Sequence, residues 1–151
     1  MEDPDNNLER ALSEIPRQFT SVSEPEFRVT VEGTVQPMHP LVQEEIYWIG
    51  REAVLNALRH SSARRIHVEL CHGVHEFRLF VRDDGNGMDP QTARLGRAGR
   101  WGVRGMLERA ARIVSKLKIR SAQPGGTEVE LCVPARVAFR RYASAGWAAP
   151  E

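Results

Sequence analysis

The sequence of 151 residues has little cysteine, no long apolar run and almost no excess of charge. Its two cysteines, Cys71 and Cys132, are too few for a disulfide framework, which favours a reducing compartment. No apolar stretch approaches the roughly 20 residues that span a bilayer, and the acidic, polar start MEDPDNNLER is unlike a secretory signal. The net charge of +1 gives no bulk signal for nucleic acid or an anionic membrane. We therefore expect a cytoplasmic protein that itself contacts neither nucleic acid nor a membrane.

The residues that are present indicate one globular domain, with 41% hydrophobic and 27% charged residues. Helical spacing of apolar residues predicts helices at about 41–60, after Pro40, and at about 102–115, with a shorter one from Asn7. Strands with one polar face would instead show alternation, and this pattern occurs at 27–31, 66–70, 77–81, 117–119 and 129–133. An all-parallel sheet between helices would show continuous apolar runs. We therefore predict a two-layer α/β sandwich with helices on one face of the sheet.

A first candidate motif lies on the long helix. Glu52, Asn56 and His60 recur every four residues and therefore share one side of it. A carboxylate and an amide oxygen one turn apart offer the hard oxygen ligands that magnesium prefers. The ordinary polar edge of a helix would give the same pattern.

A second motif, DDGNG, follows the strand at 77–81. Alternation along this strand places Asp83 on its apolar face and Asp84 toward solvent. A carboxylate at the end of an apolar row requires a partner, and the exocyclic amine of adenine is a suitable donor. Gly85 and Gly87 let the backbone approach a base closely. A plain Asp-Gly turn is the alternative.

The glycine-rich stretch from Gly87 to Gly105 contains neither a P-loop nor a dinucleotide fingerprint. Helical periodicity resumes at Val103, so a helix begins near Gly102, where free N–H groups and the helix dipole favour phosphate. We expect 88–100 to be a mobile lid that orders around phosphates, and a surface loop with solvated arginines is the alternative. Its basic residues are Arg94, Arg97, Arg100 and, in the helix, Arg104. The last motif, Gly125-Gly126-Thr127, opens the final strand as a tight turn.

In this order and spacing, the motifs resemble the ATP-binding domains of sensor histidine kinases, which share the GHKL ATPase fold. The resemblance covers about residues 25–135 and is close around REAVLNALRHSSARRIHVEL, VRDDGNGMD, GRWGVRGMLERA and GGTEVELCVP. The run WGVRGM is similar to the subgroup whose partners are LuxR-type response regulators. The resemblance implies a Bergerat-type fold, in which the sheet is mixed and mostly antiparallel with helices packed on one face. It also implies ATP and Mg²⁺ as cofactors.

The resemblance further implies a role for each matched residue. Asn56 ligates magnesium, and Glu52 is the catalytic residue, which orients a water or polarises the phosphate acceptor. Asp83 binds the adenine amine, with Thr127 beside it. The other implied contacts are Gly85 and Gly87 at the base, Gly102 and Gly105 on the phosphate side, and Arg59 and His60 at positions that often contact phosphate.

None of the five histidines is a credible phospho-acceptor, because each lies in the nucleotide helix, on or beside a strand, or before a proline. We therefore expect the catalytic part of a longer kinase, with a tail and linker helix at 1–24, the ATP-binding catalytic domain at 25–135 and a C-terminal tail at 136–151. The expected partners are the dimerisation and phospho-acceptor domain of the same kinase and a downstream response regulator. Any membrane anchor would belong to the missing part.

Two other functions stay open. A free-standing GHKL serine kinase of the anti-sigma type would share every motif and need no acceptor histidine. A degenerate domain would bind a partner and no nucleotide, although the intact Glu52, Asn56 and Asp83 argue against it.

A metal site is a further hypothesis, since histidines and a cysteine cluster within nine residues. Their spacing fits no zinc pattern, and we expect a polar sheet face instead. The residues concerned are His67, Cys71, His72 and His75.

Overall fold

The computed structural model describes residues 7–18, 24–60, 62–88, 102–122 and 125–140. The expected lid lies outside these ranges except for Met88, and so does most of the expected C-terminal tail. In chain order, the elements are α1 (Asn7–Ser13), η2 (Ile15–Gln18), β1 (Glu26–Gly33), α2 (Pro40–His60), β2 (Arg65–His72), β3 (Glu76–Asp83), α4 (Val103–Arg112), β4 (Lys116–Ala122), β5 (Gly126–Pro134) and α5 (Ala135–Ala138).

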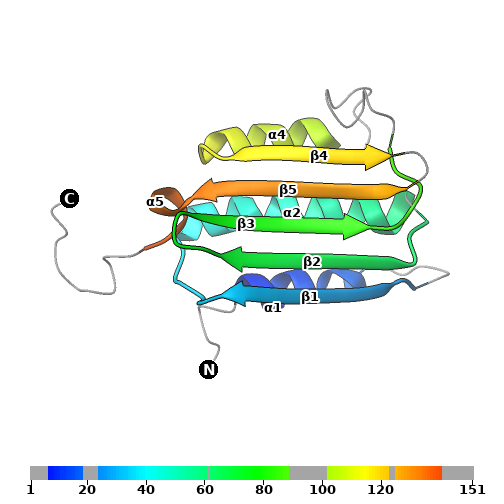
Figure 1. Ribbon diagram of the computed structural model, residues 1–151, viewed down its shortest axis with the longest axis horizontal. Helices are drawn as coiled ribbons and strands as arrows, with labels where there is room; N and C mark the ends of the chain where they lie inside the picture. Colours follow the sequence, from blue (N-terminus) through cyan, green and yellow to red (C-terminus); the bar gives the residue numbers. More distant parts are fainter. Residues whose placement is uncertain (1–6, 19–23, 61, 89–101, 123–124, 141–151) are drawn as a thin grey trace, which may run out of the picture.

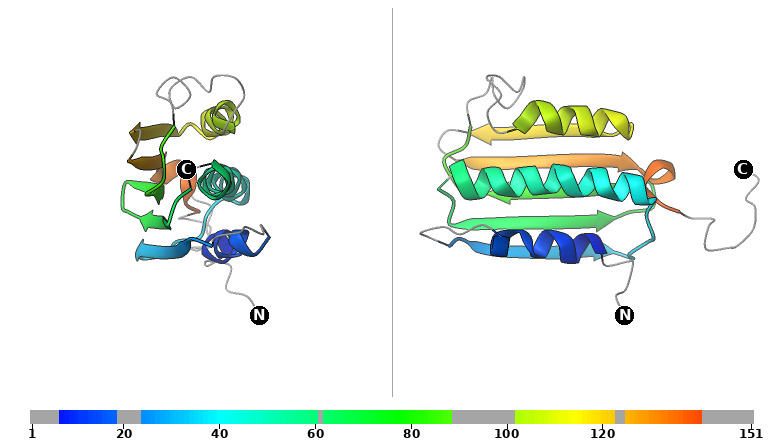
Figure 2. Two further views of the ribbon diagram at one scale, coloured as in Figure 1. Left: turned by 90° about the vertical axis from the view of Figure 1, so that its right-hand side faces the viewer. Right: turned by 180° about the vertical axis from the view of Figure 1, so that it is seen from behind.

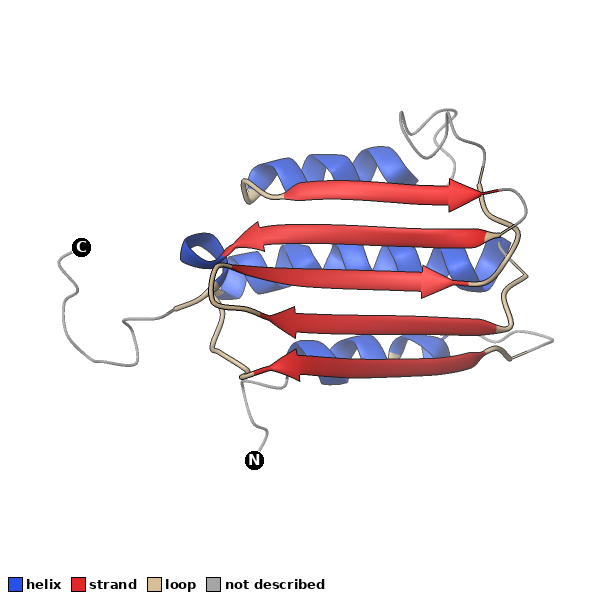
Figure 3. Cartoon of the chain, viewed as in Figure 1, coloured by secondary structure: helices blue, strands red, loops and turns tan. Residues whose placement is uncertain are grey.

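The strands form one sheet in the order β1-β2-β3-β5-β4 (Figure 1). β1 is parallel to β2, because α2 carries the chain back across the sheet between them, and the other three pairs are antiparallel. The helices α1, α2 and α4 all lie on one face of the sheet (Figures 2 and 3). The predicted two-layer sandwich with a mixed, mostly antiparallel sheet is therefore confirmed.

The core lies between the inward rows of the strands and the helix α2. On β3 the inward residues Phe77, Leu79 and Val81 are buried, and they alternate with half-buried or exposed neighbours, as the sequence predicts. α2 covers the middle of the sheet with buried residues that include Ile46 and Ile49. No helix in the described ranges is long and apolar enough to cross a bilayer.

The segment expected to be a linker contributes side chains to this core. Leu8, Leu12 and Ile15 are buried, and α1 lies beside β1 and α2 (Figure 2). Gly50 on α2 makes room for this contact, since a Cβ added there would lie 3.0 Å from Cδ2 of Leu12. The helix ends at Ser13, and the chain continues as the 3-10 turn η2, in which Pro16 has no N–H to donate.

The residues that follow β5 also pack on the domain, although 136–151 were expected to form a tail. Phe139 is buried, it forms a β-bridge with Met38, and the N–H of His39 donates to the carbonyl of Ala138 at 3.0 Å. The ring of Phe139 also stacks on His72, with 5.8 Å between the ring centroids. These contacts close the end of the sheet at which α2 begins.

We predict that α1 contributes to the stability of the whole domain. Leu12→Ala should lower the free energy of unfolding by about 2–5 kcal/mol, because Leu12 is fully buried and its removal leaves a cavity. Urea unfolding measures the change. The matched control is Leu41→Ala, whose side chain is 77% exposed and whose loss should cost no more than about 0.5 kcal/mol. Equal effects of the two substitutions would show that α1 does not stabilise the domain.

Candidate functional site

One end of the molecule gathers most of the described residues that the sequence motifs single out. The carboxyl ends of β3, β4 and α2 meet there with the amino ends of β5 and α4, at the right of Figure 1. Asp83 ends β3, Thr127 begins β5, and Glu52 and Asn56 lie in the second half of α2. The motifs are far apart in sequence, so it is the antiparallel pairing that brings them to one edge.

Polar side chains cross three strands at this edge. In the sheet register Asp83 lies opposite Thr127, and Thr127 lies opposite Ser121 of β4. Oγ of Ser121 is 2.8 Å from Oγ1 of Thr127 and accepts a hydrogen bond of 2.6 Å from the N–H of Met88. Oδ1 of Asp83 accepts the N–H of Gly85 at 2.8 Å. The edge is thus a continuous row of oxygen atoms at the end of apolar strand faces.

Sequence reasoning missed Ser121, although the rule that singled out Asp83 applies to it. Leu117 and Ile119 point to the core side of β4, and Ser121 continues the same row. A polar residue that ends an apolar row needs a partner, and three strands end in this way at one edge. The occurrence of such residues on three strands was the signal from which Ser121 could have been predicted.

The two neighbouring aspartates have different surroundings. Asp84 is exposed, and its Oδ1 accepts the N–H groups of Arg64 and Arg65 at 2.8 and 2.9 Å. The backbone hydrogen bond from Arg65, with that from Arg64, holds the pKa of Asp84 below its ordinary value. Asp84 therefore fixes the connection between α2 and β2, while Asp83 is half-buried at the strand edge, as the alternation predicted.

Buried polar side chains are scarce in the described part of the chain. Asn56 and Thr127 are the only two in the described ranges, with 6% and 7% exposure. Burying an amide or a hydroxyl costs free energy unless the group is compensated, and both side chains have interactions within the protein. Of the other predicted residues of α2, Arg59 is exposed, and the side chain of His60 lies outside the described part.

The amino end of α4 lies directly against Glu52. Gly102 precedes the helix with φ +60°, and a Cβ added to it would lie 2.6 Å from Cδ and Oε2 of Glu52. The left-handed backbone favours glycine, and any side chain there would displace the carboxylate of Glu52. Gly102 has no side chain with which to cap α4, and the first N–H groups of a helix favour an anion.

Gly105 lies in the first turn of α4 and is exposed. A Cβ added to Gly105 would meet no described atom within 4 Å. Glycine in a helix costs roughly 0.5–1 kcal/mol relative to alanine, and packing gives no reason for that cost here. The position leaves open space beside the start of the helix.

Two further features shape the strand edge. A Cβ on Gly126, whose φ is +93°, would lie 2.1 Å from the carbonyl oxygen of Asp83, so the glycine is required for β5 to approach β3. Gly85 and Gly87 are buried beside it. A hollow of about 450 Å³ opens here, lined by Asp83, Ser121 and Thr127 among others. It extends over the strand ends to the other face of the sheet, because Arg82, Arg120 and Glu128 also line it.

Comparison with known proteins identifies the domain. The profile of the family described as "Histidine kinase-, DNA gyrase B-, and HSP90-like ATPase" matches residues 42–137. The chain belongs to this ATPase family. The match runs from α2 to α5 and includes every described site residue named above.

The relatives of this ATPase-family domain are sensor proteins. The chain is 27% identical over 133 residues to a sensor protein NarQ homolog of Haemophilus influenzae, covering 85% of this chain and 22% of that protein. It is 33% identical over 93 residues to the nitrate/nitrite sensor protein NarX of Escherichia coli, covering 62% of this chain and 15% of that protein. The chain therefore spans about a fifth of the length of the relatives it matches.

The fold of the domain has also been seen in solved structures. The histidine kinase domain of a blue-light activated histidine kinase from Erythrobacter litoralis superposes with a TM-score of 0.67. The two are 23% identical, and the match covers 86% of this chain and 64% of that one. This similarity supports the shared sandwich fold described above.

The hypothetical metal cluster is not assembled on the sheet of this ATPase-family domain. Nε2 of His67 is 2.8 Å from Oγ1 of Thr30 on the open face, whereas the ring of His72 packs edge-on to Phe77 of the core, 5.1 Å away. Burial, with the charge of Arg28, lowers the pKa of His67. His67 and His72 therefore lie on opposite faces of β2.

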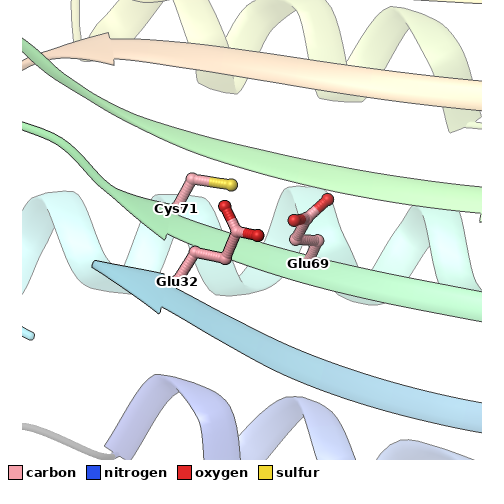
Figure 4. A group of neighbouring side chains, drawn as sticks. All are labelled: Glu32, Glu69 and Cys71. Atoms are coloured by element: carbon pink, nitrogen blue, oxygen red, sulfur yellow. The ribbon is translucent and has the colours of Figure 1, made fainter. Parts of the chain in front are cut away.

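A different group of potential metal ligands meets on the open face. Glu32, Glu69 and Cys71 point toward one another, with donor atoms within 4.8 Å (Figure 4). Glu69 is already paired with Arg82 at 2.8 Å. Burial, followed by the charges of Glu69 and Glu32, raises the pKa of Cys71 to about 11. A metal would have to displace a more tightly held proton from this thiol than from a free cysteine, which favours the polar-face interpretation.

We predict that Cys71 reacts slowly with alkylating agents. With a pKa of about 11, its thiolate fraction at pH 8 is about two orders of magnitude below that of a free cysteine. Iodoacetamide labelling of Cys132→Ser, followed by mass spectrometry, should show a rate for Cys71 that still rises above pH 10. Glu32→Gln should lower the pH at which this rate reaches half its maximum, and Glu26→Gln on the same strand is the control. A midpoint near pH 8.5 would contradict the prediction.

Proposed function

We propose that the chain is the ATP-binding catalytic domain of a sensor histidine kinase. It binds ATP with Mg²⁺ and donates the γ-phosphoryl group to a histidine on a separate dimerisation domain. The observation that supports this most is that Asn56 and Thr127, the two buried polar side chains of the described ranges, are both implied nucleotide contacts. The family match over residues 42–137, which includes both residues, and the similarity to sensor proteins point the same way.

The strand edge fits the base of the nucleotide. The Asp83 carboxylate accepts a hydrogen bond from the exocyclic amine of adenine, and Thr127 and Ser121 complete the polar row beside it. Gly85 and Gly87 leave the backbone free of side chains where the ring enters. The sheet thus recognises the base by one charge-assisted hydrogen bond at the end of the polar row.

The helix side fits the phosphates and the cation. Asn56 offers a buried amide oxygen, a ligand type that Mg²⁺ accepts, and the α4 amino end offers N–H donors. When bound, Mg²⁺ neutralises phosphate charge. Glu52 orients a water or polarises the phosphate acceptor, and Gly105 leaves room for the phosphates. Arg59 and His60 are further candidates for phosphate contacts.

The proposed partners are the phospho-acceptor domain of the same kinase and a response regulator of the LuxR type. A serine kinase of the anti-sigma type is the competing function. Incubation with labelled ATP and either a separate dimerisation domain or a candidate serine substrate distinguishes them. Phosphohistidine is lost in acid and phosphoserine is stable, so the acid stability of the label on the acceptor reports which reaction occurs. The domain organisation, with 25–135 as the catalytic domain, belongs to the same proposal.

We predict that Asp83→Asn nearly abolishes ATP binding. Since the N–H of Gly85 holds one oxygen of residue 83, the substitution places the amide N–H group where the adenine amine needs an acceptor, which should cost about 2–4 kcal/mol, or roughly 30- to 1000-fold in affinity. Calorimetry on the full chain measures the affinity for ATP. Asp84→Asn is the matched control, because its side chain keeps an oxygen for Arg64 and Arg65 and faces solvent. Unchanged affinity in Asp83→Asn would remove Asp83 from the site.

We also predict that Asn56→Ala weakens ATP binding mainly when Mg²⁺ is present, because the amide acts through the ion. Titrations with Mg²⁺ and with a chelator should therefore differ for this variant. Glu52→Ala should retain more of the binding and lose phosphoryl transfer to a supplied acceptor domain, since its role is positioning and charge stabilisation. An equal loss of affinity with and without Mg²⁺ would show that Asn56 is not a metal ligand.

A further inference from the structure

The site residues of α2 belong to a longer stripe along that helix. Glu45, Trp48, Glu52 and Asn56 follow one another at spacings of three, four and four, so all four lie on one side of α2. Glu52 and Asn56 lie in the half of α2 toward the site. Glu45 and Trp48 lie farther back, where the proposed nucleotide contacts give them no role.

α4 runs alongside α2 in the opposite direction and meets this stripe at two levels (Figures 1 and 2). At its amino end, Gly102 lies against Glu52. Seven residues later, Nη1 of Arg109 donates to Oε1 of Glu45 at 2.7 Å. Glu45 also precedes Glu52 by seven residues, so both helices rise about 10 Å between the two levels.

Trp48 fixes the same arginine from a second direction. The guanidinium carbon of Arg109 lies 5.6 Å from the centroid of the Trp48 ring, and that of Arg51 lies 5.3 Å from it. Glu45 is only 19% exposed, so its charge is partly shielded from solvent. Arg112 reaches the same carboxylate at 3.4 Å, but its side chain is 59% exposed.

Apolar packing alone does not determine how far α4 extends along α2. Val103, Met106 and Ala110 hold α4 against the core, and such contacts are non-directional. A short hydrogen-bonded ion pair and a ring contact are directional and fix the axial position. We propose that Glu45, Trp48 and Arg109 form a clamp that sets the axial register of α4 against α2 and so positions the amino end of α4 against Glu52. The effect of this clamp on ligand binding rests on the proposed function.

The proposal separates two parts of the ligand. The amino end of α4 is available to the phosphates, whereas the base is bound at the strand edge. Loss of the clamp should therefore weaken ATP binding about 3- to 10-fold, the range of a helix-end interaction with an anion, and leave adenosine binding unchanged. A general loss of folding would weaken both ligands alike.

Calorimetry with Mg²⁺-ATP and with adenosine tests this on the full chain. Arg109→Gln and Glu45→Gln should each weaken the binding of ATP but not of adenosine. The double variant should be no worse than Arg109→Gln, because that substitution already removes the contacts of Arg109 with both Glu45 and Trp48. Arg112→Gln removes the same charge from the same helix and should change ATP affinity less than 2-fold. An unchanged ratio of ATP to adenosine affinity in Arg109→Gln would overturn the clamp.

A second measurement on the ligand-free chain separates the clamp from the proposed function. The amide resonances of Gly102 and Gly105, which lie seven and four residues before Arg109, should shift in Arg109→Gln and Glu45→Gln but not in Arg112→Gln. If the unaltered chain binds no nucleotide, the proposed function fails, while these resonances still decide the clamp. Unshifted glycine resonances in both variants would refute it even where ATP binds.

Discussion

The register between β3 and β5 decides where the site can form. These two strands lie in the interior of the sheet, and their pairing sets Asp83 opposite Thr127. Since side chains alternate between faces, a slip of one residue would move one of the two to the open face. Gly126 fixes this register sterically, because its hydrogen lies where any side chain would meet the carbonyl of Asp83. β4 pairs with β5 in the sheet, and this pairing places Ser121 opposite Thr127 in the same row.

The open face of the same sheet obeys a different constraint. Arg82 joins Glu69 on one neighbouring strand to Glu128 on the other, at 2.8 and 2.9 Å, and Arg120 continues from Glu128 to Glu130. These ion pairs are partly buried, and each adds only modest stability. Their effect is to keep this face exposed to solvent, since a charged sheet face does not pack on another sheet. The helices are therefore confined to one side, and the site with them.

Periodicity in the sequence was sufficient for the elements and for part of the site. Alternation predicted the strands and distinguished Asp83 from Asp84, and helical spacing placed Glu52 beside Asn56. The order of the strands, the burial of Leu12 and the contact of Arg109 with Glu45 were not predictable in this way. They depend on which remote segments meet, and a pattern within one segment carries no information about its neighbour. The role of the lid stays a prediction, because 89–101 lie outside the described residues.

Gly105 has a consequence for how such a domain changes over generations. An alanine there would meet no described atom and would favour the helix. If the domain bound no ligand, selection for stability would therefore act against the glycine. A lineage that no longer used nucleotide would be free to replace it and would gain stability by doing so. Helix stability therefore does not explain the glycine at the first turn of α4, whereas the space that a bound ligand needs would explain it.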